Sequence, residues 1–153
     1  MFQRLLHTSD RATILLIRLM VGAVFLSEGI QKFLFPALRG AGRFEKLGLP
    51  NPEFLGSFVG SFEILSGALI LFGLFTRLAA IPTLIIMLVA IFTTKGAVLA
   101  NEGFWPMMHG SRTDWAMLLG SIYLIIEGGG KWSVDRALIG RKPRYASGEK
   151  CRM

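Results

Sequence analysis

The sequence is poor in charge and in cysteine, and it contains no motif that binds a nucleotide. Charged residues make up 18% of the 153 residues, whereas an ordinary soluble domain carries about 25%. This composition argues against a soluble globular domain, a disordered chain and a nucleic-acid-binding module. The single cysteine, Cys151, excludes internal disulfides and metal clusters that need several cysteines. The sequence also lacks a P-loop and a G-x-G-x-x-G turn after a strand.

Long apolar segments dominate instead. Hydrophobic residues make up 52% of the chain, and the mean hydropathy is +0.53. A bilayer core needs about 20 helical residues. Four segments approach or exceed that length: residues 13–34, 54–75, 78–94 and 112–130. The third is near the lower limit, and the fourth reaches spanning length only when its polar ends are included. The four segments predict an all-α, four-helix transmembrane bundle in one domain, residues 1–136, followed by a basic, flexible cytoplasmic tail over residues 137–153.

The distribution of Lys and Arg predicts how the helices are oriented. Membrane proteins keep an excess of these residues in short cytoplasmic loops. Ten lie in the N-terminal segment, the short second connection and the tail. Five lie in or beside the two longer connections, residues 35–53 and 95–111: Arg39, Arg43, Lys46, Lys95 and Arg112. Both termini are therefore predicted in the cytoplasm, in a multi-pass protein of the cell (inner) membrane. The net charge of +7 is then carried by basic segments that face the lipid bilayer, and no nucleic-acid partner is expected.

Five charged residues fall in the predicted outer half of the bundle. A charged side chain at the centre of a membrane helix costs about 2.5–3.5 kcal/mol on insertion scales, so each needs a partner or a function. Glu63 lies near the middle of the second segment and requires either a buried cation or protonation. Glu28 and Lys32 have the i,i+4 spacing that favours an ion pair along one helix. We expect these residues to form structural pairs or a polar site that accepts protons or binds a head group: Glu28, Lys32, Glu63, Lys95 and Asp114.

Other polar and small residues predict how the helices are held together. Three charged residues at the inner edge are expected to form structural ion pairs: Arg18, Arg77 and Glu127. Four residues of the second segment share one side, where small residues let two backbones approach closely: Gly56, Gly60, Glu63 and Gly67. Thr76 is predicted to cap the third helix. His7 and His109 are predicted on opposite sides of the membrane, so they cannot ligate one haem, and no metal site is expected.

Several short motifs occur in order along the chain. Residues 18–22 read R-x-x-x-G, residues 29–32 read G-x-x-K, and residues 47–50 read L-G-L-P. The second segment and the turn after it carry Glu63, Gly67, Gly73, Thr76 and Arg77. The ending, residues 128–135, reads G-G-G-K-W-S-V-D. Taken in this order, the motifs resemble the DoxX family of small bacterial membrane proteins, from about residue 11 to residue 136. The corresponding family ending is G-P-G-R-W-S-x-D, from which this chain departs by Gly129 and Lys131.

The resemblance implies a four-helix membrane fold and a link to membrane redox systems. One branch of the family is similar to the small subunit of thiosulfate:quinone oxidoreductase, and another takes part in membrane complexes that handle oxidative stress and thiols. The leading hypothesis is a small subunit of such a complex, with a quinone or a small oxidisable substrate in the polar site. Other redox subunits or a second copy of the chain are the expected partners. The chain shows no catalytic motif of its own, so no catalytic residue is assigned. A non-enzymatic scaffold or assembly factor and a small proton-coupled transporter, with Glu63 as the proton site, are the alternatives.

Overall fold

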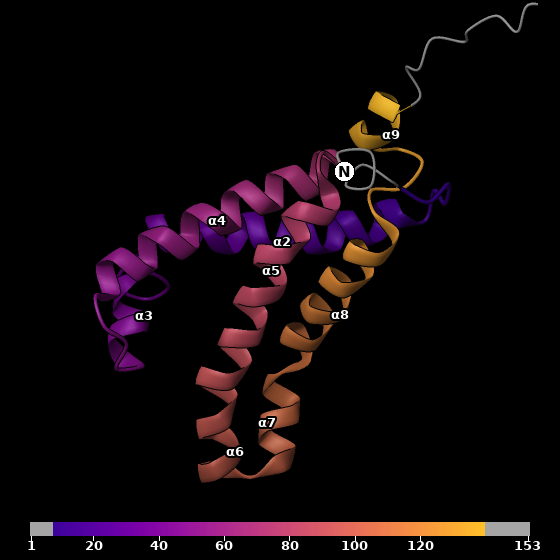
Figure 1. The fold of residues 1–153 in the computed structure, drawn as a ribbon. Coiled ribbons are helices and arrows are strands. Elements are labelled where there is room, and N and C mark those ends of the chain that lie inside the picture. The colour runs from indigo at the N-terminus through magenta and orange to yellow at the C-terminus, as the bar shows by residue number, and fades with distance from the viewer. Residues whose placement is uncertain (1–7, 140–153) are drawn as a thin grey trace, which may run out of the picture.

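The computed structural model describes residues 8–139, and this part of the chain is helical without any strand. Its elements, shown in Figure 1, are α2 Ile14–Leu34, α3 Ala41–Lys46, α4 Pro52–Phe72, α5 Thr76–Ala90, the π-helix η1 Ile91–Lys95, α6 Gly96–Glu102, α7 Phe104–Gly110, α8 Arg112–Glu127 and α9 Val134–Ile139. The prediction of an all-α protein is confirmed for these residues. Most of the predicted tail, from residue 140 onwards, lies outside the described residues.

Three helical stretches are long and apolar enough to cross a membrane, judged by length and composition: Ile14–Leu34, Pro52–Phe72 and Thr76–Glu102. The third is 27 residues long and runs through α5, η1 and α6, so the helix continues well past residue 94. The third helix was expected to end at residue 94, and it instead extends to Glu102, into the connection expected over residues 95–111. Residues 96–102 contain no proline and include good helix formers such as alanine and leucine, so nothing in them ends the helix. The turn comes at Gly103, whose φ of +93° favours glycine.

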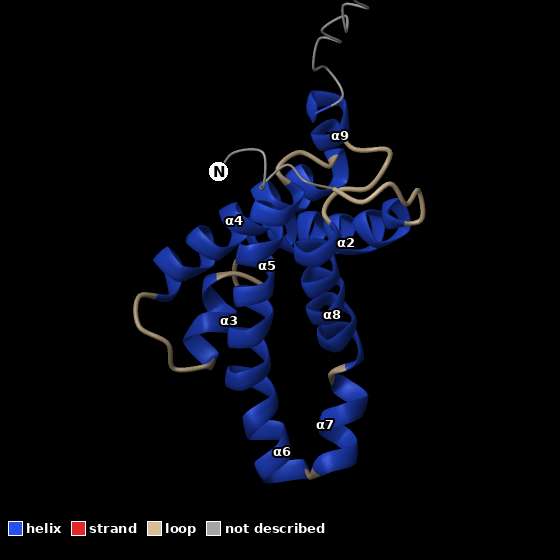
Figure 2. Ribbon diagram, turned by 45° about the vertical axis from the view of Figure 1, so that its right-hand side comes forward, coloured by secondary structure: helices blue, strands red, loops and turns tan. Residues whose placement is uncertain are grey.

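The helices form two pairs that diverge from each other. α2 lies beside α4, and the continuous α5–α6 helix lies beside α7–α8, as both views show (Figures 1 and 2). α4 packs on α5, and α2 packs on α8, near the end of the molecule that carries α9. Away from that end the two pairs separate, and α3 packs against the far part of α4. α8 is 16 residues long and follows α7 after a break at Ser111.

Glycines bring the backbones of α2 and α4 together. A Cβ atom added to Gly29 would lie 2.8 Å from the carbonyl oxygen of Gly60, and one added to Gly67 would lie 2.6 Å from the backbone nitrogen of Leu26. Real Cβ atoms do not approach backbone so closely, so only glycine fits at these crossings. The predicted close approach is confirmed for Gly60 and Gly67. Gly56 instead faces the start of α3, since its added Cβ would lie 2.8 Å from the backbone nitrogen of Ala41.

Arg18 joins the two helix pairs by binding backbone carbonyls. Its guanidinium is buried and donates hydrogen bonds to the carbonyl oxygens of Ile70 (2.8 Å), Leu71 (2.5 Å), Gly129 (3.1 Å) and Trp132 (2.6 Å). The last four carbonyls of a helix lack partners within that helix, and a buried cation with several N–H donors satisfies them. α4 is thereby connected to the segment that follows α8.

The expected ion pairs among Arg18, Arg77 and Glu127 do not form in residues 8–139. Arg77 Nη2 donates to the carbonyl oxygen of Ile126 at 2.7 Å, and Glu127 Oε1 lies 3.9 Å from Nη1 of Arg11. Arg18 and Arg77 bind backbone carbonyls at or just after helix ends, because those acceptors otherwise remain unsatisfied away from water, whereas Glu127 pairs with Arg11.

Asp135 caps α5 from a distant part of the chain. Its carboxylate accepts hydrogen bonds from the backbone N–H groups of Phe75 (2.7 Å) and Thr76 (3.0 Å) and from the Thr76 hydroxyl (3.0 Å). The prediction that Thr76 caps this helix is wrong, because Thr76 is its first residue and the carboxylate caps it instead. This contact also holds residues 128–135 against the turn between α4 and α5.

Candidate functional site

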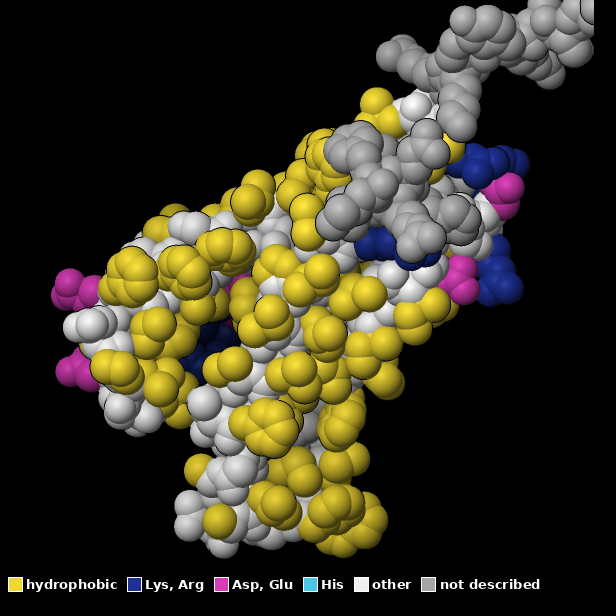
Figure 3. Space-filling view, in the orientation of Figure 1, with side chains coloured by type: hydrophobic (Ala, Val, Ile, Leu, Met, Phe, Trp, Pro, Cys, Tyr) yellow, Lys and Arg dark blue, Asp and Glu magenta, His cyan; other side chains and the backbone are white. Residues whose placement is uncertain are grey.

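A cavity of about 430 Å³ lies between the two helix pairs, on the side where they diverge. Its walls come from α2, the connection between α2 and α4, α4, α5, η1 and α8. Figure 3 shows Lys and Arg side chains in a hollow between hydrophobic side chains of the α3–α4 side and those of α5. The polar lining residues are Glu28, Lys32, Arg39, Arg43, Glu63, Thr93, Thr94, Thr113 and Asp114.

The most buried polar contact in the cavity is an ion pair between α2 and α4. Lys32 Nζ lies 2.5 Å from Oε2 of Glu63, and the two side chains are only 9% and 4% exposed. Glycine at position 60 makes room for this lysine, because an added Cβ there would lie 3.3 Å from the Cβ of Lys32. Lys32 thus supplies a buried cation for Glu63, one of the two outcomes expected at this position, the other being protonation.

Glu28 has a different partner from the one expected. Its Oε1 atom lies 3.8 Å from Nη1 of Arg39, in the connection between α2 and α4. The Glu28–Lys32 pair suggested by i,i+4 spacing is absent from residues 8–139, because Lys32 turns instead to the nearer and more deeply buried Glu63. A cation pairs preferentially where water is excluded, since an unpaired charge costs most there.

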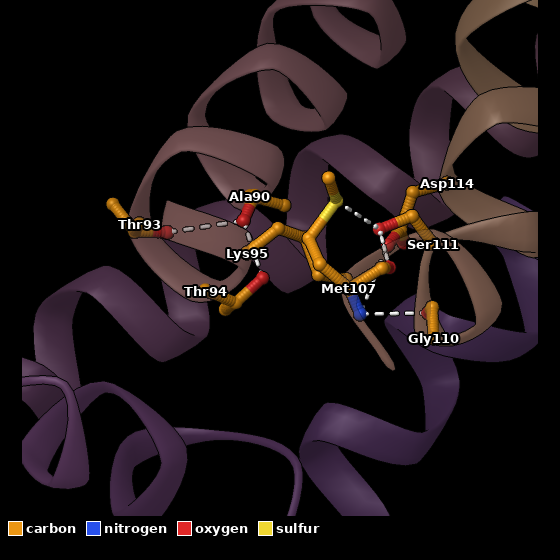
Figure 4. Close-up of polar contacts among 8 residues, drawn as sticks. All are labelled: Ala90, Thr93, Thr94, Lys95, Met107, Gly110, Ser111 and Asp114. Atoms are coloured by element: carbon orange, nitrogen blue, oxygen red, sulfur yellow. Dashed lines mark hydrogen bonds and ion pairs between the residues drawn. The ribbon is translucent and has the colours of Figure 1, made fainter. Parts of the chain in front are cut away.

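A second polar cluster lies on the other helix pair, at η1 and the start of α8 (Figure 4). Lys95 Nζ lies 3.2 Å from Oδ2 of Asp114 and donates a hydrogen bond to the carbonyl oxygen of Gly110 at 2.7 Å. Thr93 and Thr94 donate to the carbonyl oxygen of Ala90, at 3.3 Å and 2.6 Å. Single π-helical turns often occur at functional sites. Here the π-helix ends at Lys95, which forms the ion pair with the cavity-lining Asp114.

Beside Asp114, the break between α7 and α8 is also held by side chains. The Ser111 hydroxyl donates to the carbonyl oxygen of Met107 at 2.6 Å and lies 3.5 Å from its Sδ atom (Figure 4). These contacts fix the start of α8, so that Asp114 stands opposite the end of η1. The Lys95–Asp114 pair is therefore held by two ordered helix ends.

The structure brings four of the five sequence-predicted site residues into one cavity. Glu28, Lys32, Glu63 and Asp114 line it, whereas Lys95 takes part only through Asp114. Sequence reasoning assigned Arg39 and Arg43 to a connection and missed that both line the cavity. The sequence contained a signal for a role of these arginines. Basic residues are expected to be scarce on the outer side of a membrane protein, yet this outer connection carries a cluster of them.

The rest of the cavity wall is apolar. The few charged side chains within this apolar wall determine which kind of molecule the cavity can bind. The apolar lining residues are Val24, Phe25, Phe44, Leu47, Leu49, Phe58, Val59, Ile85, Ile86, Met87, Val89, Ala90 and Met117. No group of three His, Cys, Asp or Glu side chains suited to a metal ion occurs between residues 8 and 139; His7 lies outside that range. An apolar cavity with a few charged donors and acceptors suits a small organic molecule with polar groups.

Comparisons with known proteins agree with the fold. Residues 13–96 match the DoxX family. A Mycobacterium tuberculosis protein described as "Uncharacterized membrane protein Rv3486" is 51% identical over 141 residues, covering 88% of this chain and 86% of the relative. A Bacillus subtilis protein described as "Putative oxidoreductase CatD" is 30% identical over 115 residues, covering 74% of this chain and 78% of the relative. No solved structure matches the chain. The chain is therefore a multi-pass membrane protein that belongs to the DoxX family.

Proposed function

We propose that this chain is a small membrane subunit of a redox complex, and that its cavity holds a quinone or a small oxidisable molecule. The observation that carries the proposal is the buried Lys32–Glu63 ion pair in the wall of an otherwise largely apolar cavity. The Bacillus relative that is described as a putative oxidoreductase supports it. Because the described residues show no arrangement that suggests catalysis, the electrons would pass to or from other subunits.

The cavity fits a quinone ring in size and chemistry. Small-molecule sites are typically about 300–1,000 Å³, largely apolar and provided with a few placed polar groups. The Lys32 ammonium has three N–H donors, of which one is used by Glu63, so another is free for a carbonyl oxygen. When the bound molecule is the reduced quinol, the Glu63 carboxylate accepts a hydrogen bond from its hydroxyl group and takes one of the two protons released as the quinol is oxidised. A quinone, when bound, supplies reversible two-electron chemistry, while this chain binds and orients it and holds a proton at Glu63.

We also propose that α7 and α8 together form the fourth membrane crossing. Residues 104–127 would be roughly 36 Å long at about 1.5 Å per residue, enough for a bilayer core of about 30 Å. Both termini then lie in the cytoplasm of the inner membrane, and α3 and the turn at Gly103 lie on the outer side. A C-terminal green fluorescent protein fusion should fluoresce, and alkaline phosphatase fused after Gly103 should be active. The opposite pattern would contradict this topology.

Quinone extraction tests the proposed function. The protein should be purified in mild detergent as wild type, Glu63→Gln and Glu53→Gln, and the extracted lipids analysed by mass spectrometry. Glu53 is the matched control, because it lies on the same helix, is exposed and does not line the cavity. We expect quinone with the wild type and with Glu53→Gln but not with Glu63→Gln, and we expect a Glu63→Gln strain to lose respiration or oxidant resistance.

The alternatives give different results in the same experiments. A scaffold predicts that Glu63→Gln lowers stability or the retention of partner proteins without any quinone in the wild type. A proton-coupled transporter predicts Glu63-dependent flux in liposomes. Wild-type protein without quinone, together with unchanged respiration and oxidant resistance in the Glu63→Gln strain, would refute the redox proposal.

A further inference from the structure

We infer that the cavity takes an anionic amphiphile, a molecule with one acidic head group and an apolar body, and that Arg43 together with Arg39 binds its head group. The inference concerns the same cavity but goes beyond the proposed function, because a quinone has no acidic head group. It names a second class of molecule that the cavity takes, which the Lys32–Glu63 pair alone does not specify.

Three cations and three acidic groups line the cavity, but Asp114 is already paired with Lys95, which lies outside the lining, so the three lining cations have only Glu28 and Glu63 to pair with. Three ion pairs account for the other charges: Lys32 with Glu63, Lys95 with Asp114, and Arg39 with Glu28. Arg43 lines the same cavity and forms no ion pair and no side-chain hydrogen bond within the described range 8–139, although it lies near enough to Glu63 for the two charges to attract each other. One positive charge therefore remains for a ligand, and the cavity wall favours an anion.

The position of the two arginines suits a head group at the mouth of the cavity. Both belong to the connection between α2 and α4, and α3, which carries Arg43, packs against α4. The Arg39 side chain is 47% exposed and lies 3.8 Å from Glu28, so this pair is loose and leaves guanidinium donors free. Guanidinium groups bind carboxylate and phosphate through two parallel N–H donors. A head group here keeps some contact with water, which lowers the cost of burying its charge.

The rim of the cavity requires that the anion also have an apolar body. Phe58 on α4 and Ile85 and Val89 on α5 line the cavity and are 49%, 55% and 53% exposed. Both α4 and the continuous Thr76–Glu102 helix that contains α5 are long and apolar enough to cross a membrane, so we expect this side of the hollow in Figure 3 to face lipid tails. A small inorganic anion would leave this surface unused, whereas an alkyl or aryl chain covers it.

Binding of labelled dodecanoate tests the inference. The full-length protein is placed in nanodiscs of zwitterionic phosphatidylcholine, and we expect saturable binding that dodecyl phosphate displaces and dodecanol does not. Arg43→Gln should weaken binding roughly tenfold or more, since hydrogen bonds to charged groups are among the strong ones. Arg43→Lys keeps the cation and should retain most of the affinity. Because Arg43 is exposed and forms no ion pair or side-chain hydrogen bond with another residue between 8 and 139, these variants should fold normally.

Lys46→Gln is the matched control. It removes one positive charge from the same helix, α3, but Lys46 does not line the cavity, so affinity should stay within about twofold of the wild type. Adding phosphatidylglycerol to the nanodiscs identifies the source of the head group. Displacement of dodecanoate supports an acidic membrane lipid as the ligand, and continued binding supports a free acid.

Two results would overturn the inference: dodecanol binding as tightly as dodecanoate, or Arg43→Gln binding dodecanoate as well as the wild type does. The proposed redox function fails by other results, namely wild-type protein without quinone and a Glu63→Gln strain with normal respiration and oxidant resistance. Failure of one is therefore distinguishable from failure of the other.

Discussion

Replacing Lys32 and Glu63 singly and then together separates a structural ion pair from a binding site. Lys32→Met and Glu63→Leu each remove one charge and keep an apolar side chain of similar length. Either change leaves the other charge buried without its partner, since the two side chains are 9% and 4% exposed and Nζ lies 2.5 Å from Oε2. The double variant removes both charges and leaves neither unpaired.

The magnitudes follow from the burial of the pair. Removing one partner of a buried ion pair typically costs about 3–5 kcal/mol, whereas replacing both by apolar residues is often neutral or stabilising. For a chain of this length, about 1 kcal/mol shifts the melting temperature by roughly 2–4 °C. We therefore expect each single variant to melt roughly 6–20 °C lower than the wild type, and the double variant to melt near the wild-type temperature.

The assay is thermal unfolding in detergent, followed by the loss of the monodisperse peak in size-exclusion chromatography. A control cycle uses Arg136 and Asp10, whose Nη2 and Oδ1 atoms lie 2.6 Å apart while the side chains are 42% and 71% exposed. Exposed pairs contribute about 0–1 kcal/mol, so single changes there should shift the melting temperature by only a few degrees. The stable double variant should nevertheless lose the co-purifying quinone, because both polar groups of the site are gone.

Additive effects would refute the reasoning. If the double variant melts at a temperature lowered by the sum of the two single shifts, then Lys32 and Glu63 do not interact in the folded protein. If the double variant is stable and still carries quinone, then the ion pair is structural and the cavity's ligand is held elsewhere.

Three further predictions concern the fold. Arg18→Met should lower the free energy of unfolding by about 3 kcal/mol or more, because it leaves several buried carbonyls without a donor; a thermal unfolding curve within 2 °C or so of wild type would contradict this. Gly29→Leu should abolish the monodisperse peak, since its side chain would meet the backbone of Gly60, whereas Gly96→Leu, with open space around it, should leave the peak unchanged. Asp135→Ala should destabilise by about 1–3 kcal/mol through the lost cap on Phe75 and Thr76, measured by melting temperature, and an unchanged value would show that the cap is dispensable.

Local patterns in the sequence predicted the helical elements well and their ends less well. Runs of apolar residues identify membrane helices because the signal lies within each segment. The turn at Gly103 was not foreseen, because residues 95–111 contain enough polar and glycine residues to resemble a loop. The helix nevertheless continues through η1 and α6, where the adjacent α7 packs along it.

Tertiary contacts decided the partners of the charged residues. The i,i+4 spacing suggested Glu28 as the ion-pair partner of Lys32. The crossing of α2 and α4 instead places Glu63 closer to Lys32, and the side chain of Glu63 is more deeply buried than that of Glu28. Arg18 was expected to find a carboxylate, and it instead binds carbonyls from segments more than 50 residues away. No periodic pattern within one helix carries this information.

The sequence by itself determined that this chain is an α-helical membrane protein, that glycines allow two of its helices to touch, and that Glu63 needs either a buried cation or a proton. Only the tertiary structure decided that the partner of Glu63 is Lys32, that the two helix pairs diverge, and that Arg39 and Arg43 line the resulting cavity. The reason is physical: hydropathy and helical periodicity depend on neighbours along the chain. Ion pairs and cavities depend on where helices distant in sequence cross, and that is set by packing across the whole molecule.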